Sequence, residues 1–150
     1  MNAAPAPSGG NFVLLRAGAL RLLLPQSDVG PAQHMQGQPA PLAGRPGLFE
    51  QVQDGATRTV AALSDRLRPL QVFPGGRFVL TTLATAAAGE LRFAWDEVRV
   101  LIGARLEPSP LPAAMRSRGG PIDGYVQLDG ELLLCTTAQR VLAFAAGPGE

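Results

Sequence analysis

The sequence contains one cysteine, one histidine and no lysine, and only 5% of its 150 residues are aromatic. With Cys135 alone, no disulfide can form within the chain, which excludes the disulfide-rich class of small secreted domains. All 13 basic residues are arginines, and 12 acidic residues leave a net charge of +1. A chain with so little excess charge and so few aromatic rings is not expected to bind nucleic acid.

Long apolar runs are also missing. The longest segments of low charge, 78–89 and 132–139, are far shorter than the ~20 residues that a membrane-spanning helix needs, so we expect no membrane insertion. Residues 1–10 (MNAAPAPSGG) lack the basic and apolar regions of a secretory signal, which favours a cytoplasmic protein. Their small, uncharged, proline-rich composition predicts a disordered tail, and residues 147–150 are expected to form a second one.

Residues that carry most enzyme chemistry are scarce. His34 lies in a segment rich in Pro, Gly and Gln and is expected to be a solvated loop residue, whereas Cys135 ends an apolar run and is expected in the core. Asp96 and Glu97 are adjacent, so on a strand they point to opposite faces and cannot act on one substrate atom. We therefore predict no catalytic, cofactor-binding or metal-binding residues and no enzyme activity. An enzyme site made only from Asp, Glu, Arg and Ser stays open as an alternative.

Short apolar segments, separated by glycine and proline, fill most of the chain. Three pairs of them predict β-hairpins over residues 12–24, 49–63 and 122–135, the last two around the turn-forming dipeptide Asp-Gly. The end of the second hairpin, at 61–63, is also compatible with a helix. With further strands between residues 77 and 102, we count eight to ten strands, which is typical of an all-β barrel or sandwich. Residues 136–146 begin with threonine and predict a helix.

Two segments are predicted to connect strands. Residues 30–47 hold several prolines and glycines and almost no apolar side chains, which predicts a long surface loop. Three alternating prolines at 108–112 predict an extended connector. The remaining elements are consistent with one domain over residues 11–146, in which Trp95 is expected to be a core or subdomain-interface residue.

The order of motifs in the second half of the chain is distinctive. Residues 91–101 (LRFAWDEVRVL) contain Asp-x-Val at the end of a strand, and a proline-rich link leads to residues 122–134 (IDGYVQLDGELLL), an Ile-x-Gly hairpin with a polar-Gly turn, before the helix. This order resembles the CheW-like chemotaxis adaptors, whose first hairpin is similar to residues 12–25. The resemblance implies two SH3-like β-barrel subdomains that share a core, with a short C-terminal helix. The subdomains would comprise about 12–25 with 120–146, and 48–112.

The resemblance also implies four partner-binding residues: Val29, Pro31, Phe49 and Asp54. In the family, the corresponding valine, acidic residue, glycine and arginine line a groove for the chemoreceptor tip. Here Pro31, Phe49 and Asp54 replace the last three, so the chain resembles a divergent member of the family. Because the change to Asp54 reverses a charge and Phe49 adds bulk, we expect weak binding to a standard receptor tip.

These residues favour a non-enzymatic adaptor or scaffold over an enzyme. The resemblance implies a chemosensory system, either chemotaxis or type IV pilus twitching motility. The implied partners are a chemoreceptor signalling tip, a CheA-type histidine kinase or a related regulatory domain, with no cofactor. The alternative is a stand-alone β-barrel protein-binding module outside chemotaxis, with residues 30–47 as its recognition loop.

Overall fold

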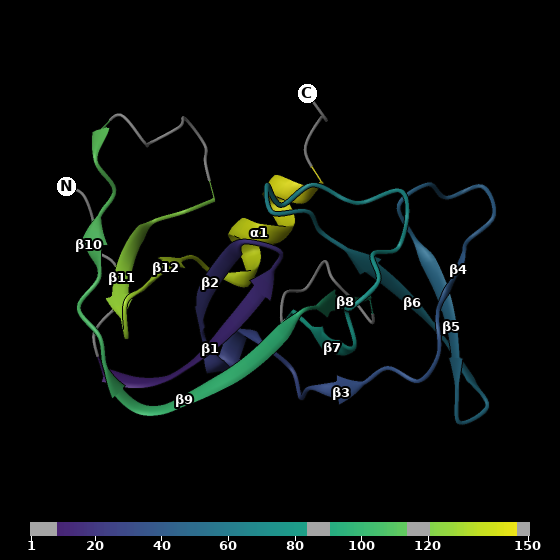
Figure 1. Cartoon of the computed structure of the whole chain (residues 1–150), viewed down its shortest axis with the longest axis horizontal. Coiled ribbons are helices and arrows are strands. Elements are labelled where there is room, and N and C mark those ends of the chain that lie inside the picture. The colour runs from purple at the N-terminus through teal and green to yellow at the C-terminus, as the bar shows by residue number, and fades with distance from the viewer. Residues whose placement is uncertain (1–8, 84–90, 114–120, 147–150) are drawn as a thin grey trace.

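Two six-stranded β-sheets and one short α-helix make up the part of the chain that the structure describes (Figure 1). The computed structural model describes residues 9–83, 91–113 and 121–146. The first sheet has the strand order β10-β11-β12-β2-β1-β9 and the second has the order β3-β7-β8-β6-β5-β4. The all-β fold with a short C-terminal helix, expected from the sequence, is confirmed.

The first sheet is built from two hairpins, one long strand and a two-residue edge strand. A hairpin at each end of the chain supplies two neighbouring strands, and β12 pairs with β2 in parallel through Leu134 and Leu22. Asp129 and Gly130 close the later hairpin with φ angles of 53° and 79°, the left-handed pair that a tight two-residue turn requires. Its strands are β1 (Gly9–Ala17), β2 (Leu20–Pro25), β9 (Glu97–Arg105), β10 (Ser109–Pro110), β11 (Gly124–Leu128) and β12 (Glu131–Cys135).

The second sheet repeats this plan with shorter strands. Asp54 and Gly55, at φ angles of 55° and 77°, close its central hairpin, and β6 pairs with β8 in parallel through Ala61 and Phe93. The segment at 61–63, which was also compatible with a helix, is therefore part of a strand and a β-bridge. The strands are β3 (Gln33–His34), β4 (Ala40–Pro41), β5 (Phe49–Gln53), β6 (Ala56–Ala62), β7 (Val79–Thr82) and β8 (Arg92–Trp95).

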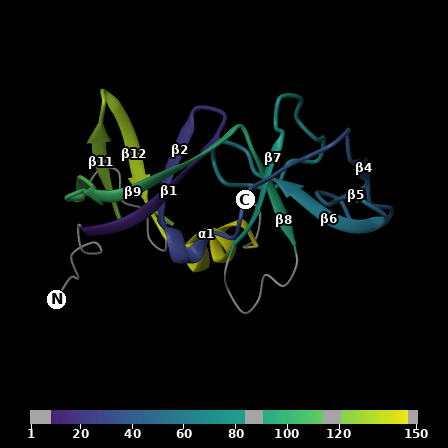
Figure 2. The ribbon, with the colours of Figure 1, turned by 90° about the horizontal axis from the view of Figure 1, so that it is seen from below.

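Helix α1 (Ala138–Ala145) covers the junction of the two sheets (Figure 2). Thr137 is its N-cap, and its Oγ1 accepts a hydrogen bond from Arg140 N at 3.2 Å. Asp28, at the end of the 3-10 helix η1 (Gln26–Asp28), accepts a second one from Ala138 N at 2.8 Å. These caps satisfy two amides at the helix N-terminus and attach α1 to the segment that leads from the first sheet into the second.

The two sheets share their largest core cluster. Leu15 and Leu22 from the first sheet pack with Phe93 and Trp95 from the second and with Val141 from α1, and all five are at most 3% exposed. The Trp95 indole donates a hydrogen bond to Thr81 Oγ1 at 2.9 Å, so its single polar group is satisfied. Trp95 is therefore an interface residue between the two halves, as the sequence predicted. Each sheet also has a smaller core of its own.

A buried ion pair, which we call the Arg77–Asp96 latch, joins the halves. Arg77 is 4% exposed, and its Nη1 donates to Leu63 O at 2.6 Å and to Ala94 O at 3.3 Å. Its Nε lies 3.2 Å from Asp96 Oδ2, which also accepts a hydrogen bond from Gly18 N at 2.6 Å. Burial lowers the pKa of the Arg77 guanidinium, and the Asp96 carboxylate opposes that shift. The latch ties the β1–β2 turn to the second sheet.

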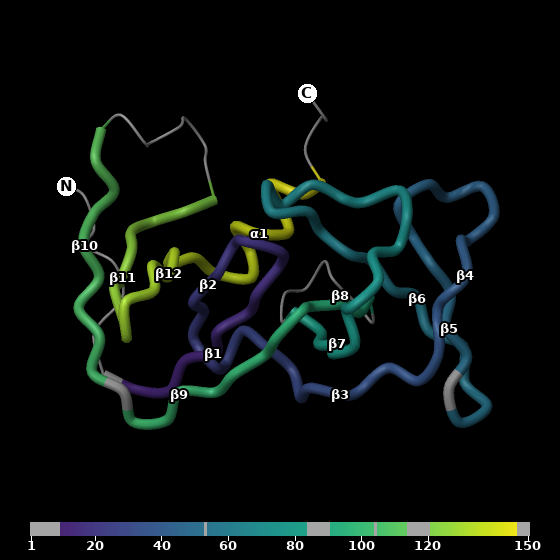
Figure 3. The backbone as a smooth tube through the Cα atoms, in the orientation of Figure 1, coloured from purple at the N-terminus to yellow at the C-terminus, as the bar shows by residue number. Residues whose placement is uncertain are grey.

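The expected subdomain boundaries need correction. The range 48–112 was assigned to one subdomain, but β9 pairs with β1 and β10 pairs with β11, so both belong to the first sheet (Figure 3). The reason is that the chain leaves the second sheet at Asp96, between β8 and β9. Residues 9 and 10, expected in the disordered tail, extend β1 because Gly9 and Gly10 pair with the end of β9. The rest of the expected tails, 1–8 and 147–150, lies outside the described residues.

The proline-rich segment 30–47 also contains more structure than expected. Its residues 33–34 pair with β7, and its residues 40–41 pair with β5, so they form the two edges of the second sheet. Strands of two residues need no apolar pattern of their own, since they add only a few backbone hydrogen bonds to an existing sheet. The loop therefore belongs to the second half of the molecule.

Candidate functional site

Val29 and Pro31 lie where the chain crosses from the first sheet to the second. Val29 follows η1, forms a β-bridge with Leu83 and packs against the shared core, whereas Pro31 is exposed. Between them, Gly30 N donates to Thr82 O at 2.9 Å, and a Cβ at Gly30 would collide with the Thr82 side chain. Glycine is therefore needed here to let the crossing segment approach β7, and Pro31 is the residue of this pair that faces solvent.

Phe49 does not have the exposure expected of a contact residue. Its side chain is 2% exposed in the core of the second sheet, with the ring centroid 5.3 Å from that of Phe73 in an edge-to-face arrangement. A partner cannot reach a ring enclosed in this way. The expectation that Phe49 lines a groove is therefore wrong, because the position supplies core volume in this chain.

Asp54 is exposed at the tip of the β5–β6 hairpin. Its positive φ angle explains the residue type, since Asp adopts the left-handed conformation more readily than most residues. This hairpin tip lies at the outer end of the molecule, whereas η1, which Val29 follows, lies beside α1 (Figures 1 and 2). The structure therefore does not bring the four predicted residues together into one groove.

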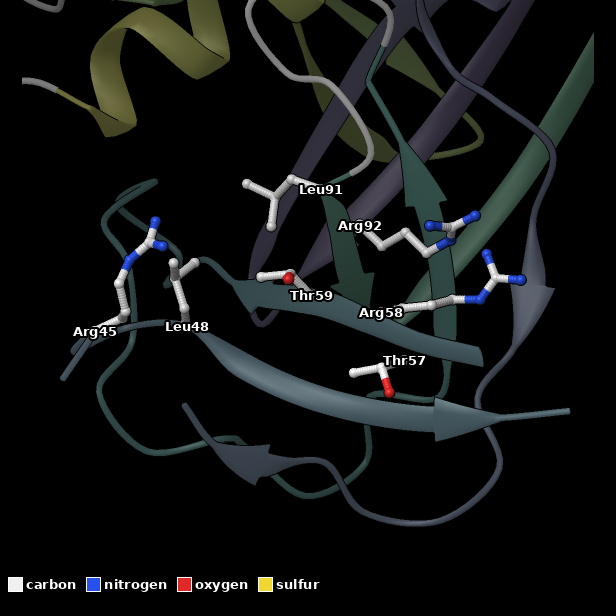
Figure 4. Close-up of a pocket in the computed structure, with 7 residues that line it drawn as sticks. All are labelled: Arg45, Leu48, Thr57, Arg58, Thr59, Leu91 and Arg92. Atoms are coloured by element: carbon white, nitrogen blue, oxygen red, sulfur yellow. The ribbon is translucent and has the colours of Figure 1, made fainter. Parts of the chain in front are cut away.

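A pocket that the sequence analysis missed opens on the second half of the molecule. Its volume is about 370 Å³, and its lining includes two apolar side chains, Leu48 and Leu91, and two threonines, Thr57 and Thr59. The remaining lining residues are all basic: Arg45, Arg58 and Arg92. None of the lining residues is acidic, although the exposed Glu50 is the cross-strand partner of Thr59, and the lining side chains are shown in Figure 4.

The three arginines occupy different sides of this site. Thr57 and Thr59 alternate with Arg58 along β6, so Arg58 extends from the opposite face of the strand. Arg92 is paired in register with Val60 and shares the face of Arg58. Figure 4 shows these two side chains extending to one end of the site. Arg45 stands at the other end, where it extends in the same direction as Leu48.

Ion pairs are distributed unequally between the halves. In the first half, four arginines form ion pairs with acidic residues of the same half. Glu97 contacts Arg16 at 3.4 Å and Arg99 at 3.1 Å. The other two pairs are Arg21 with Glu131 and Arg140 with Asp123. In the second half, Arg45 and Arg58 make no ion pair with any other residue that the structure describes. Over the described residues, the second half holds six arginines against three acidic residues, whereas the first holds five against seven. The pocket therefore lies on the half with excess positive charge.

A local sequence pattern could have predicted part of this pocket. The alternation Thr57-Arg58-Thr59 in a predicted strand places a cation between two small polar side chains. The charge excess could not be counted from the expected range 48–112, which leaves out Arg45 and includes Asp96. Leu48 and Leu91 meet through the fold alone, since 43 positions separate them.

The two residues with the most reactive side chains do not form a site. Cys135 is half-buried, and burial, with a smaller effect from Asp123, raises the pKa of its thiol to about 11, so it is a protonated thiol at neutral pH. His34 lies exposed in β3 rather than in an unstructured loop. Within the described ranges, no group of three or more His, Cys, Asp or Glu side chains could hold a metal ion. No helix within those ranges is long and apolar enough to cross a membrane.

Known proteins were compared with the chain by sequence and by structure. No family model and no curated protein matches the sequence. Among solved structures, the chain is similar to the scaffolding protein TtCheW from Thermoanaerobacter tengcongensis, with a TM-score of 0.61 and 12% sequence identity. The fold is CheW-like. The similarity covers 88% of this chain and 90% of TtCheW, so it includes both sheets, and it confirms the fold that the sequence motifs implied.

Proposed function

We propose that this protein is a non-enzymatic adaptor of a chemosensory signalling system, either chemotaxis or type IV pilus twitching motility. The observation that carries the proposal is the CheW-like fold, which extends over almost all of both chains. TtCheW is a scaffolding protein, and the sequence motifs of this chain resemble the same family without reference to its structure. Two independent lines, motif order and three-dimensional fold, therefore support one function.

The proposed partners are a chemoreceptor signalling tip and a CheA-type histidine kinase, which the adaptor would link in the cytoplasm through protein contacts alone. Binding would use exposed positions such as Pro31 and Asp54, together with the crossing segment at Val29. Phe49 would contribute only indirectly, from the core at the start of β5, the strand that leads to Asp54.

Affinity purification tests the proposal. The full chain, carrying a tag, is expressed in the cells it comes from, and the proteins retained with it are identified by mass spectrometry against a tag-only control. We expect enrichment of a chemoreceptor or a CheA-type kinase. Retention of other proteins without either of these would contradict the chemosensory assignment and favour a protein-binding module outside chemotaxis.

A further inference from the structure

The pocket beside β6 and β8 has the chemistry of a docking site for an acidic peptide. Its floor is formed by Leu48 and Leu91, both partly buried against the shared core, and Thr57 and Thr59 offer hydroxyl groups at its side. Its volume of about 370 Å³ is at the lower end of the range of roughly 300–1,000 Å³ found for ligand pockets. That space suits one or two anchored side chains rather than a large cofactor.

The charge around the pocket selects the occupant. Arg45 is exposed and extends beside Leu48, and it makes no ion pair with another residue of the described ranges. Arg58 and Arg92 extend from the opposite face of the sheet, at the other end of the site. Since charged groups within about 10 Å of one another interact appreciably at moderate salt, the exposed guanidinium group of Arg45 attracts a carboxylate of a ligand that binds beside Leu48.

A second copy of the chain is a poor match for this surface. The first half carries seven acidic residues within the described ranges, but five of them already contact a partner in the same chain. They are Asp28, Asp96, Glu97, Asp123 and Glu131. These contacts favour a different molecule as the source of the carboxylate that contacts Arg45.

We propose that this pocket binds an acidic segment of a partner protein, which inserts an apolar side chain between Leu48 and Leu91 and places a carboxylate against Arg45. The inference rests on the proposed function in one respect, that the chain works by binding proteins. It adds a surface that does not include Val29, Pro31 or Asp54. An acidic segment with one apolar anchor combines orientation by charge with burial of the anchor.

Fluorescence anisotropy with synthetic peptides tests the chemistry. The probe is a labelled nine-residue peptide with a central leucine between two runs of four glutamates, and its controls carry glutamine in place of glutamate or alanine in place of leucine. We expect the full chain to bind the acidic leucine peptide at least about fivefold more tightly than either control, which is the factor that corresponds to about 1 kcal/mol. Equal binding of all three peptides, or no binding of any, would overturn the proposal.

Two matched variants locate the binding. Arg45→Glu reverses the charge at the pocket, whereas Arg105→Glu reverses another exposed charge, on β9 of the first sheet. We expect Arg45→Glu to weaken binding about tenfold and Arg105→Glu to change it less than about twofold. Equal effects of the two variants would show general attraction by net charge and contradict a site at the pocket.

Two further measurements identify the occupant and separate the pocket from the proposed function. If the chain dimerises in analytical ultracentrifugation and Arg45→Glu abolishes the dimer, the occupant is a second copy and the proposal is wrong. If affinity purification retains a receptor or kinase but the acidic peptide does not bind, the pocket proposal fails and the proposed function stands. If the peptide binds at the pocket but no chemosensory protein is retained, the proposed function fails and the docking site stands.

Discussion

The two halves of this protein are built on one plan and differ in their charges. Each half is a six-stranded sheet with a hairpin closed by Asp-Gly, and the second strand of that hairpin pairs in parallel with another strand. In the first half, arginines and acids along the strands contact one another. In the second half, arginines outnumber acids and surround a pocket. The comparison shows that one strand plan can carry two different distributions of charge.

We expect the largest effect from removing the Phe49 side chain. This change tests whether the ring fills the core of the second sheet or lines a groove on its surface. We expect Phe49→Ala to lower the free energy of unfolding by about 3–5 kcal/mol, since it leaves a cavity beside Phe73. Urea denaturation provides the measurement, and Phe49→Leu, which keeps most of the volume, should cost less than about 1.5 kcal/mol. Wild-type stability of Phe49→Ala would place the ring on a surface after all.

We expect the second-largest loss of stability from breaking the Arg77–Asp96 latch, which joins the two halves. Arg77→Ala leaves the Asp96 carboxylate and two backbone carbonyls without their cationic partner, and we expect a loss of about 3 kcal/mol in urea denaturation. Arg99→Ala, which removes an exposed ion pair with Glu97, is the matched control and should cost less than about 1 kcal/mol. Similar losses in the two variants would mean that the halves are held together without the latch.

The reactivity of the Cys135 thiol tests whether β12 stays packed in the first half. Because its pKa is raised to about 11, its thiol should react with iodoacetamide at pH 8 about a hundredfold more slowly in the folded chain than in urea. Between about pH 9 and pH 11 the folded state holds a proton that the unfolded state loses, so the free energy of unfolding should fall as pH rises through this window. Cys135→Ser should remove that part of the pH dependence. Rapid alkylation of the folded chain would show that β12 opens.

The smallest expected effect compares the two Asp-Gly turns. Asp54→Asn removes a negative charge but keeps a residue that tolerates a positive φ angle, so stability should change by less than about 0.5 kcal/mol. If Asp54 repels an acidic receptor fragment, the variant should bind that fragment about two- to fivefold more tightly in a titration. Asp129→Asn makes the same change in the first half and should leave binding unaltered. Tighter binding in both variants would remove the distinction between the halves.

The sequence contained enough local information for the hairpins and the helix. Asp129-Gly130 predicted a two-residue turn because both residues tolerate positive φ angles, and the turn is confirmed, as is the one at Asp54-Gly55. Thr137 belongs to the predicted helix start and caps α1, although the helix proper begins at Ala138. These features depend on neighbouring residues alone, which is why a single sequence is sufficient to predict them.

Features that depend on distant residues were missed. Strand β9 pairs with β1, more than 80 positions earlier, and nothing within residues 97–105 indicates which sheet they join. Phe49 is buried because Phe73 lies against it, and alignment with a family motif could not reveal this contact. The pocket depends on the same kind of information, since Leu48 and Leu91 come from strand ends that only the second sheet brings together.

Hydrogen exchange tests most directly whether partner binding belongs to the second half. Amide exchange of the full chain is measured by mass spectrometry, alone and in complex with the protein that co-purifies with it. The account predicts that new protection appears in residues 42–49 and 57–59, around the pocket, while the strands of the first sheet exchange as they do in the free chain. New protection confined to β9, β11 and β12, with none around the pocket, would contradict it.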